Sequence, residues 1–419
     1  MVHQSPRSSA EYVDLMEQWG RHFTCIAPDT PGFGQSDSLP GEPDIADFAD
    51  ALVEALDAIG VRQCPAYGFH SGGIILMTAV KRHPRRFVCL AIGGYAVWTP
   101  DELALFGDSY LPPFRPTPYG EHLAWLWNRM LEQSWFFPWF DLRDETRLPG
   151  AHADLARVQQ AVMEMLDAGD AYRAGYGAVL RAPRDIPPVN AHVPPVLITA
   201  YAGDPLQAHI GRLGDLPAGW VARKVASPAQ HQEDSLAFLL KHGGSGLCPP
   251  LAEDEREGWL RIHGTTIHWR GERGAAVLAL HRPASELAEP LAGEVAIDAP
   301  GHGLSEAFGA IDSIMREAAA QLEVRGIRFP PAPPGDPAQL YPCLTPDRFG
   351  AHLLRAWGAA RAEALFQPWY SADKDHAILI DPAALAPGAI ASRARARLRA
   401  GDAAIPYHHY LQTLNGETQ

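Results

Sequence analysis

The chain has 419 residues, of which 47% are hydrophobic and 20% charged, a composition typical of a globular protein. A chain of this length exceeds one ordinary hydrophobic core, so we expect two domains. The formal net charge of −14 and the lack of a dense Lys/Arg stripe argue against a nucleic-acid partner, and more weakly against an anionic membrane surface.

The sequence has no run of about 18 apolar residues that could cross a membrane. The N-terminal stretch MVHQSPRSS has no apolar signal core. The cysteines lie far apart without metal-type spacing, which predicts free thiols in a reducing, cytoplasmic setting; they are Cys25, Cys64, Cys89, Cys248 and Cys343. We find no phosphate loop, dinucleotide fingerprint or metal-ligand cluster, so no cofactor or metal is expected.

Apolar runs alternate with helical periodicity in the first part of the chain. The predicted strands are 23–29, 64–68, 87–95, 194–204 and 220–226. Helical spacing predicts helices over 45–59 and 73–83, the second ended by Pro84. Strands that alternate with helices predict an α/β fold with a mostly parallel sheet covered on both faces.

Between residues 101 and 188 the pattern becomes helical and rich in aromatic residues. We predict a helical cap, because a helical insertion between strands often covers the ligand-binding edge of a sheet. Most of its rings are expected to form the cap's own core and some to line a pocket; the aromatic residues considered are Trp125, Trp127, Trp135, Phe136, Phe137, Trp139 and Phe140.

The Gly-, Pro- and acid-rich stretch 246–258 is predicted to be a linker between a first domain (1–245) and a second (259–419). Four sequence matches recur across it in the same order, which predicts an internal duplication. The matches pair 27–37 with 296–306, 120–127 with 350–357, 136–140 with 366–370, and 166–171 with 398–403.

The two copies are incomplete in opposite ways. The second copy starts with strand-like runs at 259–271 and 275–281 that have no counterpart in the first, and it lacks the first copy's later strands. One hypothesis is that these runs complete the first copy's sheet beside 64–68, which gives one composite sheet. The alternative, which we favour, is two lobes in sequence.

Several motifs of the first copy resemble the α/β-hydrolase fold family. They are HQSPRSS, PDTPGFGQSD, the turn GFHSGG, KRHPRRF, AGDP after a late strand, and a late histidine. The resemblance covers about residues 1–243 and implies the fold of that family; the second copy resembles the family's front half with its cap helices. The turn resembles a subgroup that reads G-x-H-T/S-G where most members have the nucleophile motif G-x-S-x-G.

The turn raises the question of which residue attacks. Positions two before and two after the apex of this turn must be small, because the strand and the helix approach closely there. Gly68 and Gly72 satisfy this requirement if His70 is the apex. Chemistry favours Ser71, because serine with a base is the usual acyl-transfer nucleophile. Three hypotheses stay open: the turn shifts so that Ser71 is the apex and attacks, His70 acts at the apex as base or nucleophile, or the site is inactive.

The resemblance implies roles for further residues. Asp204 stands where the family has its acid, and His231 where it has the histidine that takes the nucleophile's proton while the acid fixes its tautomer. An oxyanion hole would use the backbone N–H of Ser71, following an apex at His70, together with Gln4 or Ser5.

The predicted function is hydrolysis of a small ester, lactone or related acyl bond under the aromatic cap, without a cofactor. The apex is not an aspartate, which disfavours a carboxylate nucleophile of the dehalogenase or epoxide-hydrolase type. The alternatives are a catalytically inactive binding protein with the same fold, and a cofactor-independent lyase or oxygenase. The expected partner is a small molecule, apolar or aromatic in part; the sequence does not predict an oligomeric state.

Overall fold

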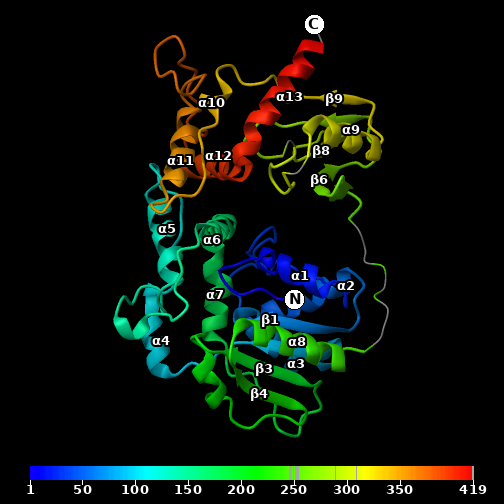
Figure 1. Ribbon diagram of the computed structural model, residues 1–419, viewed down its shortest axis with the longest axis vertical. Coiled ribbons are helices and arrows are strands. Elements are labelled where there is room, and N and C mark those ends of the chain that lie inside the picture. The colour runs from blue at the N-terminus through cyan, green and yellow to red at the C-terminus, as the bar shows by residue number, and fades with distance from the viewer. Residues whose placement is uncertain (245–247, 249, 251–253, 288, 308, 418–419) are drawn as a thin grey trace. The chain divides into compact units, whose positions relative to one another are not determined.

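The computed structural model describes residues 1–244, 248, 250, 254–287, 289–307 and 309–417 (Figure 1). The chain divides into two compact units. Unit 1 comprises Met1–Arg115 and Arg129–Ala252, and unit 2 comprises Pro116–Asn128 and Glu253–Gln419. One division therefore falls inside the predicted cap. The other falls in the predicted linker, of which residues 246, 247, 249 and 251–253 lie outside the described residues.

Unit 1 is built on a parallel sheet whose described strands lie in the order β1-β2-β3-β4. The strands are β1 (Cys64–Phe69), β2 (Phe87–Gly93), β3 (Val196–Tyr201) and β4 (Trp220–Val225), as the apolar runs predict. The strand predicted at 23–29 is wrong: these residues are irregular. A strand needs ladder partners, whereas the outer edge of β1 carries an isolated bridge between Val2 and Gly68.

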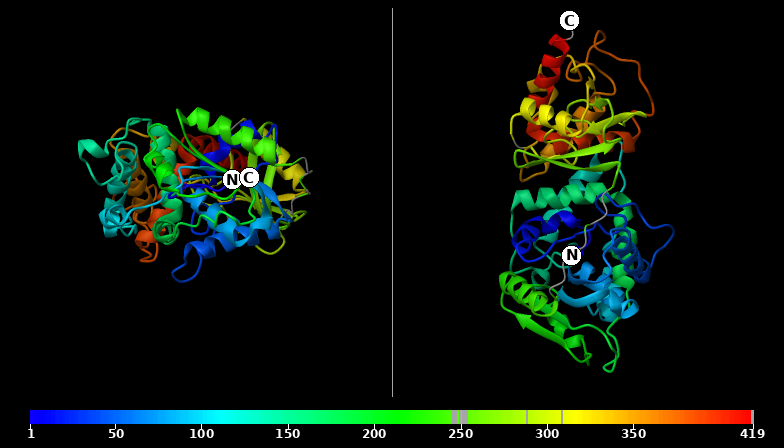
Figure 2. Two further views of the ribbon diagram at one scale, coloured as in Figure 1. Left: turned by 90° about the horizontal axis from the view of Figure 1, so that it is seen from below. Right: turned by 90° about the vertical axis from the view of Figure 1, so that its right-hand side faces the viewer.

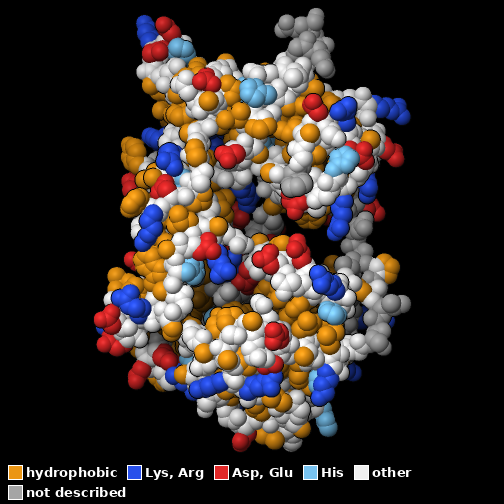
Figure 3. Space-filling view, viewed as in Figure 1, with side chains coloured by type: hydrophobic (Ala, Val, Ile, Leu, Met, Phe, Trp, Pro, Cys, Tyr) orange, Lys and Arg blue, Asp and Glu red, His pale blue; other side chains and the backbone are white. Residues whose placement is uncertain are grey.

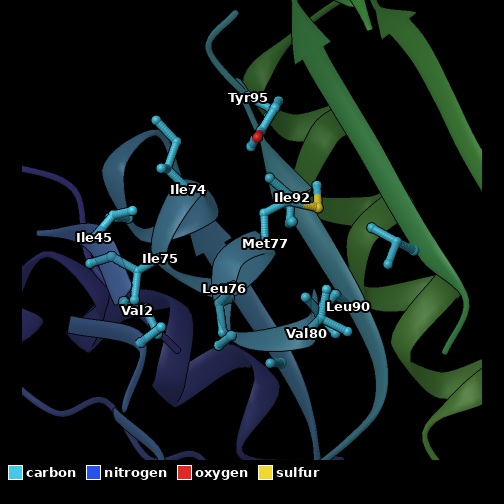
Figure 4. Packing of buried hydrophobic residues seen from close by; sticks show 14 of the residues in the cluster. Val2, Ile45, Ile74, Ile75, Leu76, Met77, Val80, Leu90, Ile92 and Tyr95 are labelled. Atoms are coloured by element: carbon cyan, nitrogen blue, oxygen red, sulfur yellow. The ribbon is translucent and has the colours of Figure 1, made fainter. Parts of the chain in front are cut away.

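Helices cover both faces of this sheet (Figure 2). Alternate strand residues such as Leu90 and Ile92 pack with α2 and α3 (Figure 4), whereas Tyr67 and Ala91 pack with α1 and α8. This period-two alternation is what a sheet buried on both faces requires. The helices are α1 (Val13–Trp19), α2 (Ile45–Ala58), α3 (Ser71–Arg82) and α8 (Pro228–His242), preceded by the short 3-10 turn η1 (Ser9–Tyr12).

The segment between β2 and β3 is helical, as the aromatic-rich pattern predicts. Its helices are α4 (Pro100–Phe106), α5 (Glu121–Gln133), α6 (Leu155–Ala168) and α7 (Tyr172–Arg181). Side chains at the starts of α4 and α6 accept hydrogen bonds from backbone N–H groups of the first turn: Thr99 from Glu102, and Asp154 from Ala156 and Arg157. The division between the two units falls within α5.

Unit 2 contains a separate sheet of described strands in the order β5-β6-β8-β7-β9. Strand β7 pairs in parallel with β8 and β9, so the hypothesis of one composite sheet with β1 is wrong. The elements are β5 (Glu257–Ile262), β6 (Thr265–Gly271), β7 (Val277–Ala279), β8 (Glu294–Ile297), α9 (Ile311–Gln321), β9 (Gly326–Arg328), α10 (Pro337–Leu340), α11 (Ala351–Ala362), α12 (Pro387–Ala400) and α13 (Ala404–Glu417).

The sequence matches recur as local geometry. The Oγ of Ser36 donates a hydrogen bond to the carbonyl of Asp29 at 2.8 Å, and the Oγ of Ser305 donates one to the carbonyl of Asp298, also at 2.8 Å. Similarly, an isolated antiparallel bridge joins Phe136 to Arg147, and another joins Phe366 to Ala377. These likenesses agree with an internal duplication, which stays a prediction.

The described residues show the surface charge on one face and the state of the cysteines. On the face drawn in Figure 3, Lys and Arg side chains are interspersed with Asp and Glu. All five cysteines are free thiols. None of the described helices is long and apolar enough to cross a membrane.

Candidate active site

The turn after β1 places His70 at its apex. His70 lies between β1 and α3 with φ 47° and ψ −111°, a conformation that L-residues rarely adopt. A Cβ on Gly68 would lie 2.7 Å from the carbonyl carbon of Gly72, and one on Gly72 would lie 2.5 Å from that of Val2. These close backbone approaches explain why glycines flank His70. Ser71 is instead the buried first residue of α3, so the hypothesis that places it at the apex is wrong.

His70 forms a pair with Asp204. Its Nε2 lies 3.2 Å from both carboxylate oxygens of Asp204, the residue that follows β3 by three positions. The Asp204 side chain is fully buried, whereas 23% of the His70 side chain is exposed. Burial alone would raise the pKa of Asp204, but the charge and hydrogen bond of His70 and the N–H of Leu206 lower it below its usual value. An ionised carboxylate only accepts, so His70 carries hydrogen on Nε2.

The neighbouring residues fit the imidazole closely. The ring stacks on Phe69, with centroids 4.1 Å apart and an interplanar angle of 17°. A Cβ at Gly94, which has φ +58°, would lie 2.6 Å from His70 Nε2 and 3.0 Å from Asp204 Oδ2. Gly94 therefore leaves the space in which the ring and the carboxylate meet.

His231 is buried among hydroxyl groups instead of pairing with Asp204. In the first turn of α8, its Nε2 lies 2.9 Å from the hydroxyl of Tyr67 and its Nδ1 lies 2.5 Å from that of Thr199. Burial lowers the pKa of His231 to about 4, so the ring is neutral at pH 7. The predicted arrangement, in which Asp204 orients His231, is therefore wrong: Asp204 orients His70.

Both predicted oxyanion donors of the N-terminal loop are engaged within the protein. The backbone N–H of Gln4 donates to Glu11 Oε1 at 2.8 Å, and that of Ser5 donates to Ser71 Oγ at 3.1 Å. Neither N–H can therefore stabilise a substrate oxyanion in this arrangement. The backbone N–H of Ser71, at the start of α3, is the one predicted donor to which the hydrogen bonds of the described residues assign no acceptor.

One further histidine near the site was not singled out in the sequence. Val97 N–H donates to Nδ1 of the buried His209 at 2.9 Å, and the Trp98 ring packs edge-on against His209 at 5.0 Å between centroids. Burial lowers the pKa of His209 to about 4. Trp98 also contacts Phe106 and Phe137 of the helical segment. In the sequence, the position of His209 just after Asp204 is the feature that could have pointed to its place near the site.

The described residues include a cavity of about 340 Å³ at another place, lined by residues of α2, α3 and α7, such as Thr78, and of the segment after α7, such as Asp185. Its lining contains neither His70 nor Asp204, and the cations Lys81 and Arg82 on its wall are paired with Asp185 and Asp50. We therefore place the candidate site at the His70–Asp204 pair. Among the described residues, no three His, Cys, Asp or Glu side chains gather as metal ligands would.

Comparisons with known proteins relate the first part of the chain to one family. Residues 1–176 match the family model of the alpha/beta hydrolase fold. Over 120 residues the chain is 28% identical to Haloalkane dehalogenase 2 of Mycobacterium tuberculosis (strain ATCC 25618 / H37Rv). The match covers 28% of this chain and 42% of that relative, so it spans less than half of the relative's length.

Solved structures of hydrolases also resemble the chain. A thermophilic esterase from Thermogutta terrifontis aligns with a TM-score of 0.46 and 15% identity, over 58% of this chain and 89% of the esterase. Epoxide Hydrolase A from Mycobacterium thermoresistibile aligns with a TM-score of 0.44 and 18% identity, over 57% of this chain and 89% of that enzyme.

Proposed function

We propose that unit 1 hydrolyses a small ester, lactone or related acyl compound, with His70 as a general base held by Asp204. The observation that carries the proposal is the 3.2 Å approach of His70 Nε2 to both oxygens of the buried Asp204. This contact keeps hydrogen on Nε2 and leaves Nδ1 as the basic nitrogen. It also stabilises the imidazolium that forms when Nδ1 accepts a proton.

The proposed reaction uses water as the nucleophile. His70 Nδ1 takes a proton as the water oxygen bonds to the carbonyl carbon, and the carbonyl π electrons move to oxygen. When the tetrahedral intermediate collapses, the bond to the leaving alkoxide breaks and His70 returns the proton to it. The products are an acid and an alcohol, or a hydroxy acid from a lactone. The backbone N–H of Ser71 is the proposed oxyanion donor.

A cofactor-independent lyase is the second candidate. The engagement of the Gln4 and Ser5 N–H groups favours it, because elimination by proton transfer needs a base but less oxyanion stabilisation than acyl transfer. The same His70–Asp204 pair would then remove a proton from carbon. The cytoplasmic location and a partly aromatic small-molecule substrate stay predictions.

The test is hydrolysis of a panel of aryl esters and lactones by wild type and four variants: His70→Gln, Asp204→Asn, Ser71→Ala and His83→Gln. His83 is the matched control, because its Nε2 also pairs with an aspartate, Asp50 at 2.7 Å, but at the far end of α3. We expect the first two variants to lose about 10²- to 10⁴-fold in kcat/KM, the range of general-base catalysis, and the others to retain activity.

Labelling with a fluorophosphonate separates the remaining possibilities. The proposal expects no covalent adduct and no burst of released alcohol, because water attacks directly. An adduct that maps to Ser71, together with an inactive Ser71→Ala variant, would replace it with a serine hydrolase. Tight binding of a panel compound without turnover would instead identify an inactive binding protein.

A further inference from the structure

Unit 2 brings together two copies of one eight-residue motif. The sequences GEHLAWLW (120–127) and GAHLLRAW (350–357) share the pattern G-x-H-L-x-x-x-W. Both lie in unit 2, which includes Pro116–Asn128. Each glycine immediately precedes a helix, α5 or α11, and has positive φ, +84° at Gly120 and +70° at Gly350.

The two motifs contact each other with their roles exchanged. The ring of His122 packs edge-on against Trp357, with centroids 4.9 Å apart at 76°. Conversely, the ring of His352 packs edge-on against Trp127, at 5.0 Å and 82°. Each histidine therefore contacts the tryptophan of the other motif in the same geometry, within the favourable range for aromatic pairs.

The glycines repeat this exchange. A Cβ on Gly120 would lie 2.9 Å from Cγ of Trp357, and one on Gly350 would lie 2.5 Å from Cγ of Trp127. A methyl group at either position would thus overlap the indole of the opposite motif. The absence of a side chain on each glycine allows each tryptophan to approach the opposite backbone.

The contact is buried on both sides. Trp127 and Trp357 are almost fully buried, as are the motif leucines Leu123 and Leu353. Both histidines are buried too, and burial lowers the pKa of His122 to about 4, so its ring is neutral when it packs on the indole. On one side of the contact, Trp127 Nε1 also donates to the carbonyl of Arg348 at 3.1 Å.

An interface in which the same residues appear on both sides is isologous, the arrangement of a two-fold symmetric dimer. A surface that pairs with its own repeat in this way is complementary to itself. We propose that G-x-H-L-x-x-x-W is a homotypic pairing element whose partner is another copy of the same motif. The two copies in this chain occupy each other, and a copy deprived of its internal partner pairs with the same copy on a second chain.

The test uses the full chain in three forms. His352→Ala/Trp357→Ala removes the rings on which the first motif packs, and His122→Ala/Trp127→Ala is the mirror variant. The third form carries all four substitutions. Sedimentation velocity over a concentration series is expected to show that each double variant reaches twice the wild-type mass, while the fourfold variant keeps the wild-type mass. Double variants that keep the wild-type mass at all concentrations overturn the proposal.

A double-mutant cycle on thermal unfolding covers the case in which a double variant does not fold. For His122→Ala with Trp357→Ala, across the motifs, the combined loss of Tm is expected to be smaller than the sum of the single losses. For His122→Ala with His352→Ala, which remove two separate ring pairs, the losses are expected to add. Additive losses across the motifs contradict the pairing.

Discussion

Substitution of Gly94 by alanine tests whether the placement of His70 against Asp204 carries the activity. Gly94 has φ +58°, and an added Cβ would lie 2.6 Å from His70 Nε2 and 3.0 Å from Asp204 Oδ2. Heavy atoms without a bond between them prefer about 3.5–4.0 Å. The ring must therefore move by about 1 Å, which lengthens the 3.2 Å contact to about 4 Å, beyond hydrogen-bond range.

Two costs follow, and they appear in different measurements. Alanine in the left-handed region costs about 1–2 kcal/mol of stability wherever it is placed. Misplacement of a catalytic group by about 1 Å costs about 10²-fold in rate. Gly60 separates the two effects, because it has φ +79° and a Cβ there meets no atom within 4 Å. Gly60→Ala therefore carries the backbone cost alone.

The assay compares kcat/KM on the best substrate of the panel with the free energy of unfolding in urea. We expect both variants to lose stability, Gly94→Ala by more because the overlap with His70 and Asp204 adds to the backbone cost, and Gly94→Ala alone to lose about 100-fold in kcat/KM. Full activity in a folded Gly94→Ala protein would refute the reasoning, because the displaced ring would then be unnecessary for the reaction.

Three further predictions concern side chains around the two sheets. Ser71→Ala is expected to lower the free energy of unfolding by about 1 kcal/mol, because the Ser71 Oγ accepts one hydrogen bond from the backbone N–H of Ser5. Its kcat, measured by steady-state kinetics, is expected to stay unchanged. His231 is 3% exposed and burial lowers its pKa from 6.5 to about 4 on folding, so between these pH values the unfolded chain binds a proton that the folded chain does not. As pH falls from 6.5 to 4, this difference should lower the free energy of unfolding of the wild type by about 3 kcal/mol. Urea titrations at each pH should show that His231→Gln does not have this loss. In unit 2, burial opposes protonation of His268, but its hydrogen bonds to Asp298 and Glu257, 2.8 Å each, raise its pKa. This histidine therefore stabilises the fold below pH 6.5 and stops doing so as pH rises through its folded pKa, and the Tm difference between wild type and His268→Gln should shrink towards alkaline pH.

The apex of the turn could be predicted from the sequence because its cause is local. The close approach of Gly68 to Gly72 depends on five consecutive residues, and the same spacing fixes His70 between them. Asp204 could also be placed, because it follows a strongly apolar strand at the edge where parallel strands end. The four strands of the unit 1 sheet could be predicted because each is an apolar run of the length typical of a strand.

The partners of these residues could not be predicted, because they depend on contacts between distant segments. His231 lies in the first turn of α8 at a position that buries it against Tyr67, 164 residues earlier. Ser71 Oγ meets a backbone N–H 66 residues away, at Ser5. The strand predicted at 23–29 overlaps the stretch that matches the end of β8, yet β8 is a strand because β6 and β7 flank it, whereas residues 23–29 are irregular. In each case contacts with distant segments decide the outcome.

The geometry around His70 weighs against the hypothesis that this residue only fills a turn. His70, with φ 47° and ψ −111°, lies in a conformation that costs an L-residue about 1–3 kcal/mol and that glycine adopts more readily. Strained residues persist where their surroundings fix them, and such sites are often functional. Here Phe69 stacks on the ring, Gly94 leaves space for it, and Asp204 is buried against it. Filling the turn requires none of these three features, whereas holding an imidazole with one basic nitrogen in a fixed direction requires all of them.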